Sequence, residues 1–181
     1  LTGVALNIND LQYWTIAGPS LWNVFTVLGV QTADPMMIDL PFAMAYEVQQ
    51  KRCILEGIAE KYELRLQAPE LPVPSETQLG PAHRALVGQL QGFYRQRLAD
   101  DKDRIWLEFT TAMAATLSLN ESVGSQIEQD NLEELSDLLG KRPANLKAGL
   151  ARLQDAIMDD HMSDLEPRLN FLYRMEVRRD Y

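Results

Sequence analysis

The densest group of polar side chains is Asp159-Asp160-His161, followed by Asp164. Paired aspartates on a helix can hold Mg²⁺ for diphosphate chemistry. Their DDxxxD spacing is one residue longer than the DDxxD of terpenoid-type enzymes, which also need a second acidic site. Acidic residues before a helix also fit a structural role, because negative charge stabilises a helix N-terminus. The cluster is therefore a candidate binding site or an acidic cap for the last helix.

An enzyme built on this sequence would have to assemble its site from residues that are distant along the chain. There are two histidines, and neither follows a glutamate by three residues, as the Glu-x-x-His pairs of di-iron bundles require. The candidates for such a site are His83, His161, Asp160, Glu56 and Glu60. The two glutamates share a helical face with Glu63, which is also typical of a solvated acidic surface.

Local catalytic and cofactor motifs are missing from the chain. It has no phosphate-binding loop, dinucleotide fingerprint, Cys-x-x-Cys pair or nucleophile elbow. The sequence therefore predicts no cofactor, no metal and no catalytic residue. Cys53 is the one cysteine, so no internal disulfide can form, and we expect a small buried side chain in a reducing compartment.

The composition is that of an acidic globular protein. The chain has 181 residues, 46% of them hydrophobic, and a formal net charge of −9. Binding to nucleic acid or to an anionic membrane needs clustered Lys and Arg, so we expect neither. The uncharged stretch from Leu11 to Ala33 is interrupted by polar residues and by Gly18-Pro19, which favours two buried helices over a membrane span. We expect a soluble, cytoplasmic protein.

Helical periodicity covers nearly the whole chain. We expect an all-α compact bundle of about seven to eight helices in a single domain, 1–181, with a candidate subdivision at the Pro-rich segment 69–74. After two short helices near the N-terminus, helices are expected at about 40–66, 81–98, 102–119, 130–139, 146–157 and 165–179. The helical pattern of segment 120–129 is weaker, and Leu1–Ile8 is the only candidate for a strand.

Particular residues set the expected helix ends and faces. Pro81 opens a helix, and Gly140 closes one. Asp130 and Glu133 have the spacing of a capping box, which predicts a helix start at Asp130. One helical face is predicted to be apolar and consists of Ile105, Trp106, Phe109, Met113 and Leu117.

Aromatic side chains are concentrated near the N-terminus, at Tyr13, Trp14, Trp22 and Phe25. Two short helices need fewer aromatics than this for their own packing. An exposed set would make an interface with a partner or with a second copy, and a buried set would be core. Trp14 and Trp22 are therefore candidate binding residues.

One segment resembles a known family. The run Asp160-His161-Met162-Ser163-Asp164-Leu165, with Leu169, Phe171 and Leu172, is similar to a signature of the TorD-like redox-enzyme maturation chaperones. Trp106 to Phe109 and Glu121-Ser122-Val123 are loosely similar to two further segments of that family. Ile157-Met158 stand where the family usually has Glu-Pro. The resemblance implies an all-α protein that binds twin-arginine signal peptides of molybdenum enzymes near its Asp-His pair.

These observations lead to three hypotheses of function. The first is a non-enzymatic helical protein that binds another polypeptide, itself included, in assembly or as a chaperone. The second is the twin-arginine signal-peptide chaperone, with Asp159, Asp160 and Asp164 at the rim of its peptide groove. The third is a helical enzyme with a carboxylate and histidine site.

Overall fold

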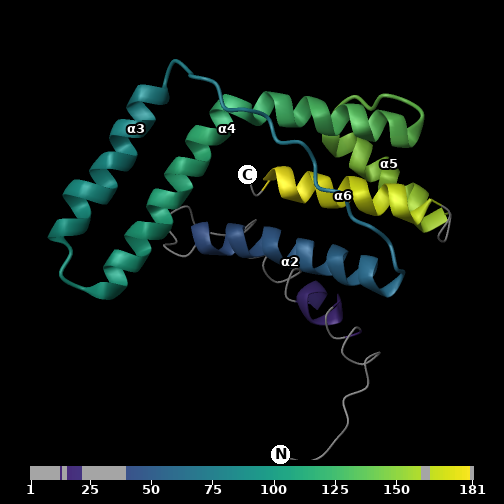
Figure 1. The fold of residues 1–181 in the computed structure, drawn as a ribbon, viewed down its shortest axis with the longest axis horizontal. Helices are drawn as coiled ribbons and strands as arrows, with labels where there is room; N and C mark the ends of the chain where they lie inside the picture. The colour runs from purple at the N-terminus through teal and green to yellow at the C-terminus, as the bar shows by residue number, and fades with distance from the viewer. Residues whose placement is uncertain (1–12, 14–15, 22–39, 160–163, 180–181) are drawn as a thin grey trace, which may run out of the picture.

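The computed structural model describes residues 13, 16–21, 40–159 and 164–179, and gives only the backbone for 40–45. The described residues form helices, turns and extended connections, with no strand among them (Figure 1). The protein is all-α, as predicted. The strand candidate Leu1–Ile8 lies outside the described residues. Residues 16–21 are helical throughout, so the break expected at Gly18-Pro19 is wrong.

Helix α2 spans Leu40–Lys61 and ends five residues earlier than predicted. Its end is closed by two backbone hydrogen bonds, from the N–H of Leu64 to the carbonyl of Ala59 at 2.9 Å and from Glu63 to Glu60 at 3.2 Å. Glu63 has a φ of 54°, the left-handed conformation that such a helix end requires. In the sequence, the apolar pattern continues beyond this turn with Leu64 and Leu66. These two side chains are apolar because the chain folds back onto α2, where they pack against its core residues.

Residues 64–79 form a linker that returns from α2 across the molecule. Figure 1 shows it passing α6 and α4 before it reaches α3. It carries no helix, and it contains Pro69, Pro72 and Pro74. Proline lacks an N–H donor and favours extended backbone, which is why no helix forms across residues 69–74.

A helical hairpin, which we call the arm (residues 80–118), follows the linker. Its first half is α3, Gly80–Gly88, continued by the π-helical turn η1, Gln89–Tyr94, and the 3-10 turn η2, Arg95–Arg97. Pro81 stands in the first turn of α3, as predicted. Figure 1 shows the arm projecting from the rest of the protein.

Helix α4, Asp101–Leu139, provides the second half of the arm and then enters the body. Figure 1 shows it bending part-way, so that its first part lies beside α3 and its second part beside α5 and α6. Ser122 donates to the Leu119 carbonyl at 2.8 Å, a side-chain bond that often bends a helix. It lies where the sequence predicted a weak segment.

The helix start predicted at Asp130 is wrong, since Asp130 lies inside α4. Asp130 accepts from Gln126 at 2.6 Å and Glu133 accepts from Gln129 at 3.0 Å. Each acceptor thus pairs with an amide one turn earlier, on the surface of an uninterrupted helix. The predicted number of seven to eight helices is not confirmed in the described residues, in part because segments 102–119 and 130–139 belong to one helix. Gly140, with a φ of 64°, ends α4 as predicted.

The body consists of α2, residues 119–139 of α4, α5 (Leu146–Asp159) and α6 (Leu165–Arg179). Its core has two clusters. Leu135, Leu153 and Phe171 join α4, α5 and α6, while Leu55, Ala59 and Leu169 join α2 to α6. Within the described part of the chain, no helix is both long and apolar enough to cross a membrane.

Candidate functional site

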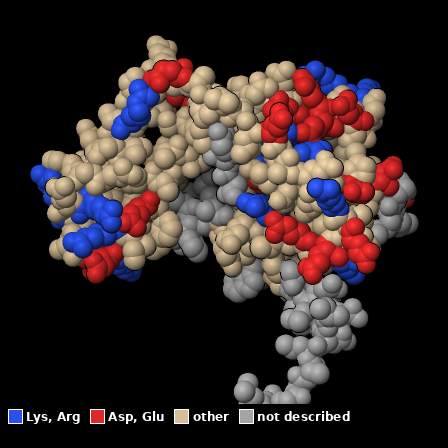
Figure 2. Space-filling view, viewed as in Figure 1, with Lys and Arg blue, Asp and Glu red and all other residues tan. Residues whose placement is uncertain are grey.

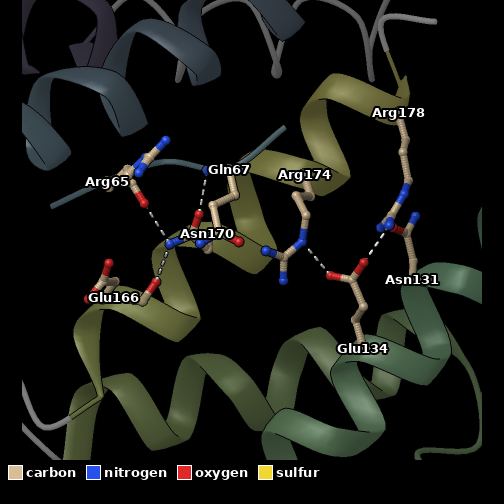
Figure 3. A network of polar contacts seen from close by, with 8 residues as sticks. All are labelled: Arg65, Gln67, Asn131, Glu134, Glu166, Asn170, Arg174 and Arg178. Carbon is tan, nitrogen blue, oxygen red and sulfur yellow. Dashed lines mark hydrogen bonds and ion pairs between the residues drawn. The ribbon is translucent and has the colours of Figure 1, made fainter. Parts of the chain in front are cut away.

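Asn170 of α6 is buried and holds the linker in place. Its Oδ1 accepts from the backbone N–H of Gln67 at 2.7 Å, and its Nδ2 donates to the carbonyls of Arg65 and Glu166 at 3.1 Å each (Figure 3). The amide side chain thus replaces the regular backbone partners that the linker lacks. This contact fixes one wall of a groove between the linker, α4 and α6.

A charged network joins α6 to α4 on the other side of that groove. Glu134 accepts from Arg174 Nε at 2.7 Å and also from Arg178, which donates in addition to Asn131 at 2.8 Å (Figure 3). Arg178 is only 5% exposed, so its charge depends on Glu134 for compensation. The candidate residues predicted from the sequence did not include this pair. Arg174 and Arg178, four residues apart and therefore on one face of α6, were the available signal.

The groove itself has a volume of about 520 Å³. Phe171 and Leu138 give it an apolar part, and its three carboxylates, Glu134, Asp137 and Glu166, outnumber its one cation, Arg174. Glu134 is neutralised by its arginines. Asp137 and Glu166 are exposed, and among the described residues no cation pairs with either carboxylate. The groove can therefore accept a basic group beside an apolar one.

A second charged cluster lies between α2 and α6. Lys51 Nζ is 2.6 Å from Glu47 and 3.7 Å from Glu176, and Arg179 Nη1 is 3.2 Å from Glu47 and 3.7 Å from Glu176. Burial acts to raise the pKa of Glu47, but hydrogen bonds from Lys51 and Arg179 outweigh it and lower that pKa. Burial raises the pKa of Glu176, and the same two cations, each 3.7 Å away, lower that pKa too little to offset burial.

The acidic cluster predicted as a binding site is only partly described. Asp159 ends α5 and Asp164 precedes α6, and both are exposed. Asp164 has a φ of 57°, and its carbonyl accepts from the N–H of Arg168 at 3.3 Å in the first turn of α6. Asp160 and His161 lie outside the described residues, as do Trp14 and Trp22.

The enzyme candidates that are described do not meet in one place. His83 Nδ1 lies 3.2 Å from Glu121 Oε2 without forming a hydrogen bond, and Thr77 donates to the same oxygen at 2.8 Å. Glu56 and Glu60 point to solvent on α2, as expected for an acidic surface. Among the described residues, no group of three His, Cys, Asp or Glu side chains is arranged to hold a metal ion.

The arm presents the other unusual surface. Large apolar side chains are exposed along it, with 51% of Phe93, 52% of Ile105 and 58% of Leu117 accessible. The apolar face predicted for residues 105–117 is therefore not buried as a whole, although α3 and η1 contact α4. Figure 2 shows broad uncharged surface on the arm and many Asp and Glu on the body.

No protein-family model, curated protein or solved structure matches this chain.

Proposed function

We propose that this protein acts by binding another polypeptide, and that the arm is the binding surface. The observation that carries this proposal is the exposure of large apolar side chains along the arm. Exposed apolar patches of this kind are typical of protein–protein contact sites. The role fits assembly or a chaperone-like function, without chemistry of its own.

The side chains near the tip of the arm have the chemistry of interface anchors. Phe93 and Tyr94 pack edge to face, with ring centroids 5.2 Å apart, and the guanidinium of Arg97 lies 3.4 Å from the centre of the Phe93 ring. Aromatic and arginine side chains supply most of the binding energy in protein interfaces. Their mutual packing also limits the rotamer entropy that binding would cost.

Site-specific photo-crosslinking tests this proposal. A photoreactive phenylalanine analogue replaces Phe93 in the full chain, in its native cells, and the matched control carries the analogue in place of Glu56 on the acidic face of α2. We expect a protein adduct from position 93 and none from position 56. Adducts from neither position, or equally from both, would contradict the arm as the binding surface.

The groove supports a second candidate, the recognition of a twin-arginine signal peptide of a molybdenum enzyme. The observation in its favour is that Asp137 and Glu166 line this groove and form no ion pair with a described residue, since its one cation, Arg174, pairs with Glu134. Glu166 also lies two residues after Asp164. A carboxylate pairs well with a guanidinium, and the apolar part of the groove suits the hydrophobic residues of such a peptide.

Peptide titration tests this second candidate. We expect a labelled twin-arginine peptide to bind the full chain more tightly than the same peptide with both arginines changed to glutamine. Asp137→Asn with Glu166→Gln should remove that preference, while Asp159→Asn with Asp164→Asn tests the rim predicted from the sequence. Equal binding of the two peptides would dismiss the signal-peptide function.

A further inference from the structure

The arm meets the body at a point where three segments of the chain come together. Thr77, near the end of the linker, donates to Glu121 Oε2 of α4 at 2.8 Å, and His83 Nδ1 of α3 lies 3.2 Å from the same oxygen. Figure 1 shows the linker reaching α3 beside the bend of α4. Glu121 lies just beyond the arm, so its carboxylate connects the arm to the body.

His83 stands at a position through which the arm packs on α4. Of residues 81–97, only His83, Val87 and Leu90 are half-buried, and the others are exposed. Their separations of four and three residues place them on one helical face. Helices in proteins gain most of their stability from packing of such a face. Since this half of the arm buries so few side chains, one polar contact of His83 has a large share in fastening it.

The contact between His83 and Glu121 is incomplete. Nδ1 is shielded from solvent and has no hydrogen-bond partner among the described residues, although 3.2 Å to Oε2 is within hydrogen-bond distance. A neutral imidazole offers this oxygen either a lone pair or an uncharged N–H, whereas an imidazolium offers a charged donor, which forms the stronger bond. Uptake of a proton by His83 would therefore complete the contact.

The other charged groups around His83 leave this role to Glu121. The elements that pack most against α3 are η1, which carries no charge, and α4, whose residues 109–127 contain Glu121 as their only charged residue. Arg84 follows His83 in α3 and is paired with Glu76 of the linker by two hydrogen bonds, of 2.8 and 3.1 Å. That pairing holds the pKa of Glu76 below its ordinary value, so the two charges stay paired over the range in which histidine titrates.

We propose that His83 and Glu121 form a pH-sensitive clasp, which closes when His83 takes up a proton and then fastens α3 to α4 at the base of the arm. Histidine is the side chain whose charge ordinarily changes between about pH 5 and 8. Because the charged form of His83 gains the bond, the fastening is present in mild acid and is lost as the pH rises through the titration of His83. The clasp concerns the attachment of the arm and does not depend on the proposed binding function.

Hydrogen–deuterium exchange of the full chain tests the clasp. Protection factors, which are corrected for the intrinsic pH dependence of exchange, report how often a helix opens. We expect the amides of α3 to be at least about threefold better protected at about pH 5.5 than at about pH 8, as a partly exposed, charge-assisted hydrogen bond would produce. The amides of α5, in the body, are the internal reference and should not change in this way.

Four variants assign the effect to its residues. His83→Gln and Glu121→Gln keep polar side chains but cannot form the ion pair, so each should abolish the difference between the two pH values. His161→Gln removes the other histidine of the chain, and Glu128→Gln removes an exposed glutamate of α4. Both of these controls should retain the difference.

The clasp is overturned if α3 of the wild type is equally protected at both pH values, or better protected at the higher one. A difference that survives in either clasp variant, or that vanishes in either control, overturns it as well. Circular dichroism shows whether each variant keeps its helix content, and the wild-type comparison needs no variant at all. None of these outcomes bears on crosslinking from position 93, so the binding function is judged separately.

Discussion

Asn170 holds the backbone of Gln67, 103 residues earlier in the chain, with a hydrogen bond of 2.7 Å from the Gln67 N–H to Oδ1. Because the same side chain also donates to the Arg65 carbonyl, one residue of α6 fixes the start of the linker. The path of the linker leads directly to the arm, so this contact helps to set where the arm begins.

Removal of this amide should destabilise the protein. In Asn170→Ala, the Gln67 N–H and the Arg65 carbonyl lose their partner, and a buried unsatisfied group costs about 1–3 kcal/mol. We expect the free energy of unfolding to fall by about 2 kcal/mol in urea titrations. Asn120→Ala, at an exposed asparagine of α4, is the control and should stay within about 0.5 kcal/mol. Equal losses in both variants would mean that the linker contact contributes nothing specific.

Loss of Glu134 should be more damaging than loss of its neighbour Glu133. Glu134→Ala leaves Arg178 buried without its carboxylate, and breaking one side of a buried pair costs about 3–5 kcal/mol. Glu134 itself is a quarter exposed, so we expect the low end of that range. Glu133→Ala removes only an exposed contact with Gln129 and should cost about 0.5 kcal/mol or less. Parallel denaturant unfolding of the two variants measures the difference.

Replacement of each of two glycines by alanine should change the stability of the protein in opposite directions. A Cβ on Gly149 would clash with Leu135 Cδ2 and would lie 2.8 Å from Pro143 Cγ, while one on Gly88 meets nothing within 4 Å. Gly149→Ala should therefore cost about 1–3 kcal/mol through overpacking. Gly88→Ala should stabilise by up to about 1 kcal/mol through helix propensity. Thermal unfolding gives both signs, and a stabilising Gly149→Ala would refute the close approach of α5 to α4.

The pH dependence of stability should report the two buried glutamates. Because the pKa of Glu176 is raised, its contribution is present below pH 4.5, the ordinary value, and is lost as pH rises through the folded pKa. Because the pKa of Glu47 is lowered, its contribution is present above pH 4.5 and is lost as pH falls through the folded pKa.

Glu176→Gln isolates the first of these effects. We expect the variant to lose less unfolding free energy than the wild type as pH rises above 4.5, since the glutamine has no proton to give up. Unfolding in urea at a series of pH values measures this slope. Glu60→Gln, on the exposed face of α2, should leave the wild-type profile unchanged. An identical profile in Glu176→Gln would show that burial does not perturb Glu176.

Much of the fold could be predicted from the sequence because its signals are local. Pro81 and Gly140 mark helix ends through their own backbone preferences, and the leucines of α6 repeat with helical spacing. Where a nonlocal contact decides, the prediction was wrong. Leu64 and Leu66 continue the apolar period of α2, but the chain has already turned back onto that helix. Only the tertiary packing distinguishes a longer helix from a chain that folds back in this way.

The candidate sites depended still more on tertiary structure. By itself, the sequence determined an all-α, acidic chain, because helical period and charge count need no knowledge of neighbours. Only the fold decided that Arg178 is buried against Glu134 and that Asn170 holds the linker, since these partners lie 44 and at least 103 residues apart. It also decided that Ile105 and Leu117, which the periodicity placed on one apolar helical face, are exposed on the arm. Periodicity shows which residues share a face, whereas burial of that face depends on what the rest of the chain places against it.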